Sequence, residues 1–465
     1  MRVFRLSLLA MIFCLSLTPG RAATSALRGE WNVILIVNDA LRADHMGTYS
    51  YARNTTPHID RFFKSGAIFS NAFAQATWTL PSLASIMTSL YPSVHGAIYF
   101  PNDAKWVEDG YTPPAGKILD NSRLTLAEVL QDRGYLTAGV ASGGFTNSAF
   151  GFSQGFSQYV DGYKSMQGIN RTILPWLEKN HAQKFFLYIH SIDAHDPYKT
   201  SPRFDQLWDP DYVGDIDGRR EIVTAVNNGK RTLSKDDLHH LIALYDGGIS
   251  YLDEQLGQLF DKLDELDVAD KTLIVLTADH GEQFMEHGNL SHGWLAPYDE
   301  VLRVPLLFRV PAQATGRQIA QVVESIDIMP TILDFLAITP PQPVQGQSLL
   351  PLVYGAASQA GTAFAESAHS DDKRDAVRVL RTRRWKYIRR MNSGPDELYD
   401  LKKDPLERVN RIAEEPDLIK SLTLQFTQWE QENLRVKKSL PPLTGKPSSL
   451  EEETVEQLKF LGYLP

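Results

Sequence analysis

The sequence predicts an α/β protein in which helices cover both faces of a large, mixed but mostly parallel β-sheet, followed by a small C-terminal α+β subdomain. Two observations support the large sheet: short runs that are apolar throughout alternate with helical patterns, and these runs end at polar residues. The subdomain is predicted because the chain changes, beyond about residue 360, to short alternating segments rich in Arg. A chain of 465 residues is long enough to bury one large core.

Four apolar runs are the predicted strands of the large sheet, and two alternating segments are predicted for the small one. The runs are Val33–Val37, Phe185–Ile189, Leu273–Leu276 and Leu306–Phe308, and the segments are Val377–Leu380 and Trp385–Ile388. The apolar runs lack the alternation of a half-exposed strand, so we expect both of their faces to be buried.

Three helices are predicted from periodicity and from their ends. Leu124–Asp132 is amphipathic and stops before Gly134, and Leu241–Leu266 repeats apolar residues every three to four positions. Ser82–Leu90 follows Pro81, which suits the first turn of a helix.

The chain is predicted to divide into four parts. Residues 1–22 form a signal peptide, 31–350 a catalytic α/β domain, 360–440 the subdomain with a small antiparallel sheet, and 441–465 a tail. Arg2 and Arg5 precede the short apolar run Leu6–Leu17, and small residues favour cleavage after Ala22. We therefore expect a secreted or periplasmic protein, with an uncleaved anchor as the alternative.

Composition excludes some classes of function. The only cysteine, Cys14, lies in the predicted signal peptide, so the mature chain has neither thiol nor disulfide chemistry. The formal charge is −9 and no basic stripe is present, which argues against a nucleic-acid partner. After signal removal, no apolar segment is long enough to predict a transmembrane span.

Polar residues that follow the predicted strands form a candidate metal site. Asn38 and Asp39 follow the first strand, and Asp279 and His280 follow another. Ligands of open parallel sheets bind beyond the carboxyl ends of the strands, so these side chains are expected at one rim. Mostly oxygen ligands favour one calcium, magnesium or manganese ion, and the imidazole also allows zinc. The alternative is that each Asp only forms a turn or caps a helix.

Thr79 is a candidate nucleophile, because it directly precedes the predicted helix at 82–90. The N-terminal end of a helix attracts oxyanions such as sulfate or phosphate, and a nearby cation lowers the pKa of a hydroxyl. The alternative is that Thr79 merely caps the helix. His287 and His292 flank a glycine-containing loop, and their spacing alone supports a catalytic role only weakly.

Several segments resemble sulfatases, and they occur in the same order as in that family. They are NVILIVNDALRADHMG at 32–47, TPHIDRFFKSGAIFSNAFA at 56–74, WTLPSLASIMTSLYPSVHG at 78–96, HSIDAHDPY at 190–198, TADHGEQFMEHGNLSHGWLAPYDEVLRVP at 277–305 and ELYDLKKDPLERVN at 397–410. The resemblance covers about residues 31–410, and it implies the fold of the alkaline phosphatase superfamily.

The resemblance also implies roles for individual residues. The family resemblance implies one divalent metal ion, with calcium as the expected metal. The ion would be held by Asp39, Asp279 and His280, together with Asn38 and the nucleophile Thr79. The expected catalytic histidines are His195, which assists the leaving group, and His292, which contacts the transferred oxygens. The expected substrate-binding residues are His190, Asp193 and His287.

One departure from the family concerns the nucleophile itself. Sulfatases use Cys-x-Pro-Ser-Arg and oxidise the cysteine to formylglycine, but here the motif reads Thr79-Leu80-Pro81-Ser82-Leu83. Oxidation of threonine would give a ketone instead of the aldehyde, and the arginine is replaced by leucine. Phosphodiesterase and phosphotransferase relatives in the superfamily use threonine nucleophiles.

The sequence therefore supports three functional hypotheses. The first is a hydrolase of phosphate diesters or phosphonate esters that attacks through Thr79. The second is a sulfatase that works without formylglycine, and the third is a non-catalytic protein that kept the anion pocket. In each case the expected partner is a small-molecule, glycan-linked or lipid-linked sulfate or phosphate ester, while the oligomeric state stays open.

Overall fold

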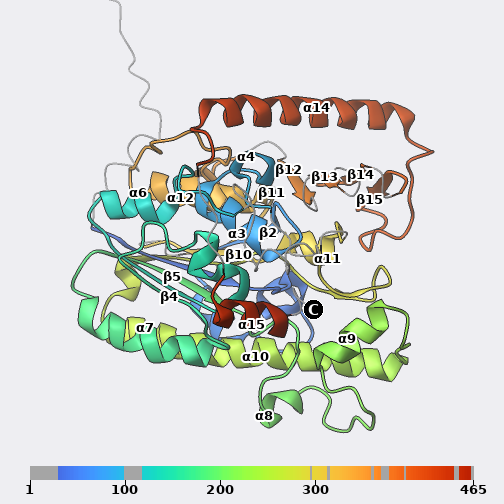
Figure 1. The fold of residues 1–465 in the computed structure, drawn as a ribbon, viewed down its shortest axis with the longest axis horizontal. Helices are drawn as coiled ribbons and strands as arrows, with labels where there is room; N and C mark the ends of the chain where they lie inside the picture. The colour runs from blue at the N-terminus through green and yellow to red at the C-terminus, as the bar shows by residue number, and fades with distance from the viewer. Residues whose placement is uncertain are drawn as a thin grey trace, which may run out of the picture. The chain divides into compact units, whose positions relative to one another are not determined.

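A sheet of nine strands forms the centre of the part of the chain that the structure describes (Figure 1). The structure is a computed structural model, and it describes residues 30–98, 118–293, 296–311, 315–357, 361–367, 376–391, 394–444 and 450–461. The predicted signal peptide at 1–22 lies outside these residues. Within them, no helix combines the length and apolar character needed to span a membrane.

The order of the strands in the large sheet is β11-β2-β10-β6-β1-β5-β3-β4, with β9 paired to β2. Their bounds are β1 Asn32–Asn38, β2 Ala67–Phe73, β3 Leu136–Ala141, β4 Gln158–Val160, β5 Phe185–Ser191, β6 Thr272–Ala278, β9 Arg303–Val304, β10 Leu306–Arg309 and β11 Arg317–Glu324. β1 runs parallel to β5 and β6, whereas β10 is antiparallel to β6 and β2. The predicted mixed, mostly parallel sheet is confirmed, and all four apolar runs are strands in it.

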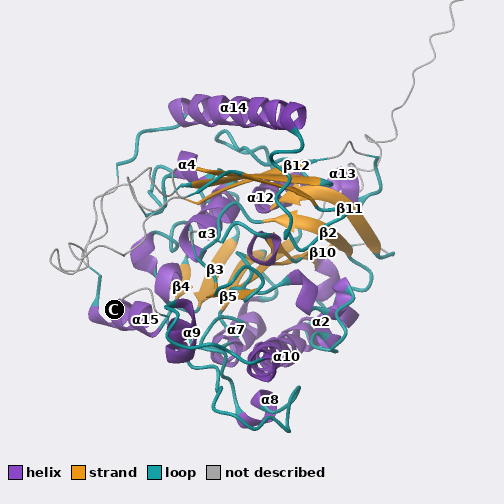
Figure 2. Ribbon diagram, turned by 90° about the vertical axis from the view of Figure 1, so that its right-hand side faces the viewer, coloured by secondary structure: helices purple, strands orange, loops and turns teal. Residues whose placement is uncertain are grey.

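Helices cover both faces of this sheet (Figures 1 and 2). One layer contains α7 (Met166–Asn180) and the long α10 (Lys235–Glu265), and the other contains α3 (Thr79–Thr88), α6 (Leu126–Asp132) and α12 (Ile328–Phe335). The other helices are α2 Pro57–Phe62, α4 Pro92–His95, α8 Pro202–Asp205, α9 Arg220–Asn227, α11 Asp299–Leu302, α13 Leu350–Val353, α14 Pro416–Ser439 and α15 Glu452–Phe460. Short 3-10 turns are η1 Ala43–His45, η2 Gly47–Tyr49, η3 Gly144–Thr146, η4 Ser148–Phe150, η5 Ala269–Lys271 and η6 Ser325–Asp327.

The ends of the predicted helices differ from the observed ones for local reasons. α10 begins six residues before the predicted Leu241, because Ser234 and Asp237 form a capping box there. α6 begins at Leu126, since the side chain of Thr125 accepts a hydrogen bond from the backbone N–H of Glu128. α3 begins at Thr79 and ends at Thr88, where Ser89 turns to a left-handed φ of 56°.

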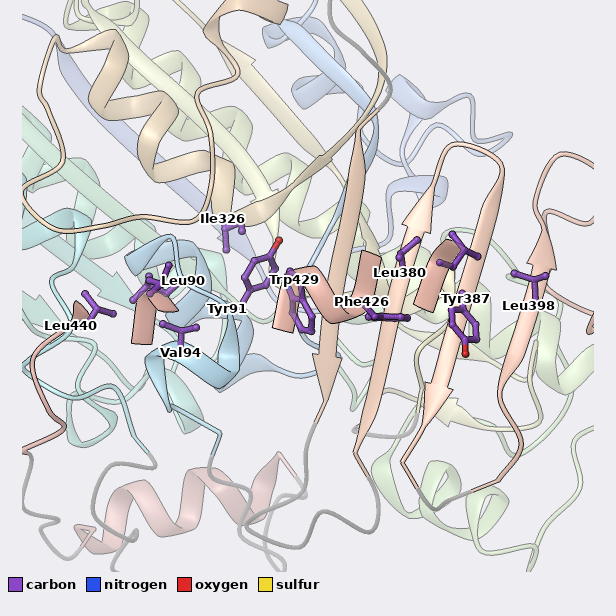
Figure 3. Packing of buried hydrophobic residues seen from close by; sticks show 12 residues of the cluster. Leu90, Tyr91, Val94, Ile326, Leu380, Tyr387, Leu398, Phe426, Trp429 and Leu440 are labelled. Carbon is purple, nitrogen blue, oxygen red and sulfur yellow. The ribbon is translucent and has the colours of Figure 1, made fainter. Parts of the chain in front are cut away.

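The small C-terminal sheet is antiparallel, as predicted, and packs against the first part of the chain. Its strands are β12 Thr362–Ser367, β13 Val377–Thr382, β14 Trp385–Arg390 and β15 Glu397–Asp400, and a two-stranded ribbon of β7 (Gln283–Phe284) and β8 (Leu290–Ser291) lies apart from it. One hydrophobic cluster combines residues of the segment between α3 and α4, of α4, of this sheet and of α14 (Figure 3). Its buried members include Leu90, Tyr91, Leu380, Phe426 and Trp429. The regions predicted at 31–350 and 360–440 therefore share a core.

The segment expected to be a tail, 441–465, contains helix α15. Four apolar side chains in the described part of this segment are buried, namely Leu450, Val455, Leu458 and Leu461. Helix α15 packs on the loop that follows β3, close to the carboxyl ends of the central strands.

Candidate active site

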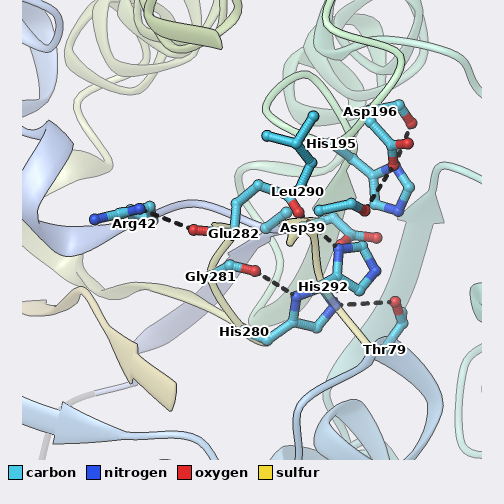
Figure 4. Close-up of polar contacts among 12 residues, drawn as sticks. Asp39, Arg42, Thr79, His195, Asp196, His280, Gly281, Glu282, Leu290 and His292 are labelled. Carbon is cyan, nitrogen blue, oxygen red and sulfur yellow. Dashed lines mark hydrogen bonds and ion pairs between the residues drawn. The ribbon is translucent and has the colours of Figure 1, made fainter. Parts of the chain in front are cut away.

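The candidate site lies where β1, β5 and β6 end (Figure 4). Asn38, the last residue of β1, pairs with Ser191 of β5 on one side and Ala278 of β6 on the other. The residues that follow these three strands therefore meet, although the end of β1 is more than 150 positions from the ends of β5 and β6 in the sequence. Asp39 comes from β1, and Asp279 and His280 come from β6.

Asp39, Asp279 and His280 form a buried cluster that fits one metal ion. One ligand atom from each lies within 4.8 Å of the other two. The Nε2 atom of His280 is 3.4 Å from Oδ1 of Asp39 and 3.6 Å from Oδ2 of Asp279. Both of these carboxylate oxygens are buried without a hydrogen-bond donor. Leaving such atoms unsatisfied is costly, and a bound cation is a partner that suits their chemistry.

Hydrogen bonds orient these ligands. The Nδ1 atom of His280 lies 3.0 Å from the carbonyl oxygen of Gly281. Because a carbonyl oxygen can only accept, the proton of the neutral ring is on Nδ1, and the lone pair of Nε2 is directed toward the site. Oδ1 of Asp279 accepts hydrogen bonds from the backbone N–H groups of Ala40 and His280, so Oδ2 is the oxygen turned to the site. Burial and the neighbouring Asp279 carboxylate raise the pKa of Asp39. A bound cation would remove this repulsion.

Asn38 is less clearly part of the cluster. Its amide oxygen accepts a 2.9 Å hydrogen bond from the Ser191 hydroxyl, and its Nδ2 is buried without a partner. Exchanging the two amide positions would free the oxygen and keep a hydrogen bond to Ser191.

Thr79 lies at the start of α3, and its side chain is buried beside the cluster. Its hydroxyl oxygen is 3.3 Å from Nε2 of His280. The capping position is occupied by Trp78, which makes no side-chain capping hydrogen bond, so Thr79 is the first helical residue and not the cap. The dipole of the helix places positive potential next to its hydroxyl.

His195 and His292 complete the cluster from two different loops (Figure 4). The ring of His292 lies 4.1 Å from that of His280 and 4.8 Å from that of His195, between centroids. Nδ1 of His292 is 3.2 Å from a carboxylate oxygen of Glu282, and Nδ1 of His195 is 3.2 Å from one of Asp196. Burial lowers the pKa of His195 to about 4 and also lowers that of His292.

Three functional residues were not predicted from the sequence. Glu282 and Asp196 are buried and contact the two histidines, and each keeps one carboxylate oxygen without a hydrogen-bond donor. Arg220, the first residue of α9, donates a 2.9 Å hydrogen bond to Asp196. Glu282 and Asp196 lie inside the quoted motifs and could have been found by their proximity to histidines. Arg220 has no comparable signal, because the segment around it carries no recognisable pattern.

The structure treats the three predicted substrate-binding residues differently. It brings His190 into the cluster, where its Nε2 lies 4.0 Å from both Asp39 and Asp279. Asp193 instead accepts a hydrogen bond from the backbone N–H of Met166, the first residue of α7. His287 bonds through one ring nitrogen to Glu300 and through the other to the carbonyl oxygen of Glu407. Asp193 and His287 are thus held by other parts of the fold.

Two family models match the chain. The sulfatase model matches residues 31–338, and a model described as N-sulphoglucosamine sulphohydrolase, C-terminal, matches residues 286–432. The first covers the large sheet and the candidate site, and the second covers the whole small sheet and part of α14.

Relatives with known names include both sulfate and phosphorus chemistry. The chain is 24% identical over 445 residues to an arylsulfatase of Clostridium perfringens, covering 83% of this chain and 90% of that protein. It is 26% identical over 478 residues to the multifunctional alkaline phosphatase superfamily protein PehA of Trinickia caryophylli, covering 83% and 91%. Among solved structures, the phosphonate monoester hydrolase of Agrobacterium radiobacter has a TM-score of 0.69 at 21% identity, covering 90% of this chain and all of that one.

Proposed function

Since the chain belongs to the sulfatase family, among the ester hydrolases of the alkaline phosphatase superfamily, we propose that it hydrolyses phosphate diesters or phosphonate esters with Thr79 as the nucleophile. One observation carries this proposal. The hydroxyl of Thr79 is buried 3.3 Å from His280, at the position where the family places its modified cysteine. A threonine hydroxyl can attack phosphorus directly, whereas it cannot form the aldehyde hydrate that sulfatases use.

A divalent cation held by Asp39, Asp279, His280 and Thr79 would lower the pKa of the hydroxyl and draw negative charge from the transferred group. Family resemblance favours calcium, and the ligands also suit magnesium, manganese or zinc. The chain's own contribution is to orient these groups and to exclude water from the hydroxyl. Only 2% of the surface of Thr79 is exposed.

The two steps of the reaction use the groups around Thr79. In the first, the Thr79 oxygen, which has already lost its hydroxyl proton to solvent, bonds to phosphorus, the bond to the leaving oxygen breaks, and His195 donates a proton to that oxygen. In the second, water attacks phosphorus, His195 takes a proton from it, and the bond from phosphorus to Thr79 breaks, so that Thr79 leaves as the alkoxide and His195 is protonated again. The N-terminal end of α3 and the His292 ring would stabilise the phosphoryl oxygens. An anionic ester beside His195 favours its protonated form.

A panel of four chromogenic substrates tests this proposal: bis(4-nitrophenyl) phosphate, 4-nitrophenyl phenylphosphonate, 4-nitrophenyl phosphate and 4-nitrophenyl sulfate. The chelator-treated protein is reconstituted with each of the four metals in turn. We expect the diester or the phosphonate to have the highest kcat/KM. Thr79→Ala should lower kcat by about 10³-fold or more, whereas Thr79→Ser keeps the hydroxyl and should retain part of the activity.

Thr88→Ala is the matched control, because Thr88 is a buried threonine of the same helix whose hydroxyl donates only to the carbonyl oxygen of Ala84. Its kcat should stay near that of the wild type. Equal turnover by Thr79→Ala and the wild type would remove the nucleophile assignment.

A sulfatase that works without formylglycine is the second candidate. It is favoured by the matched arylsulfatase and by the N-sulphoglucosamine sulphohydrolase C-terminal model. A higher kcat/KM for 4-nitrophenyl sulfate than for every phosphorus ester in the panel would establish it. Turnover of none of the four substrates by metal-loaded protein would instead favour the non-catalytic anion-binding protein.

Export from the cytoplasm is a separate proposal, supported by the signal peptide predicted at residues 1–22. Cleavage after Ala22 would give a mature N-terminus at Ala23, which N-terminal sequencing of the exported protein detects. An intact N-terminus on a membrane-bound protein would favour the uncleaved anchor.

A further inference from the structure

His190 lies at the carboxyl end of β5, beside the two carboxylates of the candidate metal site. Its side chain is fully buried, and its Nε2 has no hydrogen-bond partner. A buried ring nitrogen without a partner is costly and calls for an explanation. The atoms nearest to it that carry charge are Oδ2 of Asp39 and Oδ2 of Asp279, each 4.0 Å away.

The other ring nitrogen of His190 is already fixed. Nδ1 lies 2.8 Å from the hydroxyl oxygen of Ser142, the residue that follows β3. A histidine that binds a metal through one nitrogen usually holds a hydrogen-bond acceptor with the other, which sets its tautomer and its ring orientation. With its proton on Nδ1, His190 presents the lone pair of Nε2 to the carboxylates. The Nδ1 atom of His280 is held by a carbonyl oxygen, which can only accept, whereas the Ser142 hydroxyl can accept from the Nδ1 of His190 or donate to it.

The distances also suit a shared ion. Two ligand atoms bonded to one ion at about 2.0–2.4 Å lie roughly 3–4.5 Å apart, according to the angle between them. The separations from His280 to the carboxylates are 3.4 and 3.6 Å, and those from His190 are 4.0 Å. At 4.0 Å, a direct hydrogen bond between His190 and either carboxylate is excluded, so a bridging ion explains this geometry better than an ion pair does.

We propose that His190 is a further ligand of the cation that Asp39, Asp279 and His280 hold, so that the site offers two imidazoles beside its carboxylates. Two imidazole nitrogens shift the preference of a site from calcium toward zinc, copper, iron or nickel. The site therefore selects a transition metal, against the calcium that family resemblance implies. This inference rests on the metal site of the proposed function, but its test measures metal binding and not turnover.

Cobalt and copper are the spectroscopic probes, added to chelator-treated full-length protein. Pulsed electron paramagnetic resonance of the copper-loaded protein counts coordinated imidazoles, and we expect two in the wild type and one in His190→Gln. In competition with a chromophoric chelator, His190→Gln should bind zinc about 100-fold more weakly and change calcium binding by much less. Ser142→Ala keeps the imidazole but loses the bond that orients it, and should weaken zinc binding about 10-fold.

His287→Gln is the matched control, because both ring nitrogens of His287 are engaged away from the site. Its zinc affinity should equal that of the wild type. Circular dichroism of the metal-free proteins verifies folding. If His190→Gln does not fold, the zinc affinity of Ser142→Ala and the number of coordinated imidazoles in the wild type still test whether His190 binds the ion.

One imidazole in the wild-type spectrum, or unchanged zinc affinity in folded His190→Gln, would overturn the proposal. If two imidazoles of the wild-type protein coordinate copper but the protein hydrolyses no phosphorus ester, the assignment of His190 as a ligand is retained and only the proposed reaction is overturned.

Discussion

At the scale of single residues, Arg220 is the guanidinium closest to the two histidines that we propose for catalysis, His195 and His292. It donates to Asp196, which lies beside His195, and its charge contributes to the lowered pKa values of His195 and His292. Its Nε is buried without a hydrogen-bond partner, and 26% of its side chain is exposed. The sulfatase motif carries its arginine at the position of Leu83, so α9 supplies positive charge from another part of the chain.

Replacing Arg220 should therefore weaken catalysis more than it weakens folding. We expect Arg220→Ala to lower kcat/KM by about 10–100-fold, because an anionic substrate loses a charged donor in a partly buried site. Arg219→Ala is the control, since Arg219 precedes it, is 56% exposed and pairs with Asp217 at the surface. Steady-state kinetics with the preferred ester compares the two, and equal effects would contradict a specific role for Arg220.

Removing the metal should destabilise the fold, because Asp39 and Asp279 would remain buried together without a counter-charge. We expect a chelator to lower the Tm and added zinc or manganese to restore it. At a metal concentration of about 100 times the Kd, bound ion contributes roughly 2.7 kcal/mol. Scanning calorimetry of the wild type and Asp279→Ala tests this, and Asp279→Ala should show little response to metal. A metal-dependent Tm shift of equal size in both proteins would contradict the assignment.

At the scale of elements, helix α15 fits onto glycines of the loops after β3 and β4. The side chain of Gln457 accepts a hydrogen bond from the N–H of Gly144, and a Cβ atom at Gly144 would lie 2.5 Å from Leu461. This loop begins at Ser142, which orients His190. The end of the chain therefore supports one wall of the candidate site, about 300 residues away in sequence.

A methyl group at Gly144 should loosen α15. Gly144 has a φ of +64°, and Gly229 has a φ of +68° with nothing near a Cβ atom. Both Gly144→Ala and Gly229→Ala pay the left-handed backbone cost of about 1–2 kcal/mol, but only Gly144→Ala displaces Leu461. Limited proteolysis should therefore release the last residues faster from Gly144→Ala. Equal rates in the two variants would show that α15 does not depend on this contact.

At the scale of the whole molecule, buried charges connect the small sheet to the large one. Lys386 of β14 is fully buried and forms 2.8 Å ion pairs with Asp299, at the start of α11, and with Glu407. Glu324, at the end of β11, accepts hydrogen bonds from Tyr91 and from the backbone N–H of Phe364 in β12. These links, together with the shared apolar cluster, predict cooperative unfolding of the two regions.

Lys386→Met should be strongly destabilising, because it leaves the Asp299 and Glu407 carboxylates buried without their shared cation. We expect a loss of about 3–5 kcal/mol in the free energy of unfolding. Lys420→Met is the control, since Lys420 is 78% exposed and its ion pair with Asp417 should contribute less than about 1 kcal/mol. Urea unfolding of both variants measures the difference, and similar losses would contradict the account.

Stability should fall as the pH rises from about 6 to 9. Burial raises the pKa of Glu324 to about 8 and that of Asp327 to about 7, in each case above the value for an exposed carboxyl. A group with a raised pKa in the folded state stabilises the fold fully below its unfolded pKa, and this contribution is lost as the pH passes its folded pKa. Glu324→Gln, which stays neutral, should reduce the loss between pH 6 and 9.

The control for this pH dependence is Glu178→Gln, since Glu178 is 56% exposed and pairs only with Lys262 at the surface. Urea unfolding at several pH values measures the slope for each protein. An unchanged slope in Glu324→Gln would show that Glu324 is already ionised at pH 6.

The sequence by itself determined the class of fold and the three residues of the candidate metal site. Apolar runs show where parallel strands end, and Asp39, Asp279 and His280 directly follow those ends, so local order was enough to select them. Thr79 was also found from local order, although its helix begins earlier than predicted, because Trp78 and not Thr79 occupies the capping position.

Only the tertiary structure decided which distant groups share the site. The strand order β6-β1-β5 places Asp39 between segments that lie 150 to 240 residues away, and it brings His190 to within 4.0 Å of two carboxylates. Arg220 reaches Asp196 from a helix without any sequence signal, while His287, inside a matching motif, is bound elsewhere. Local patterns fix where a strand or helix ends, but the packing of distant elements decides which side chains face one another, because burial and charge pairing act through space and not along the chain.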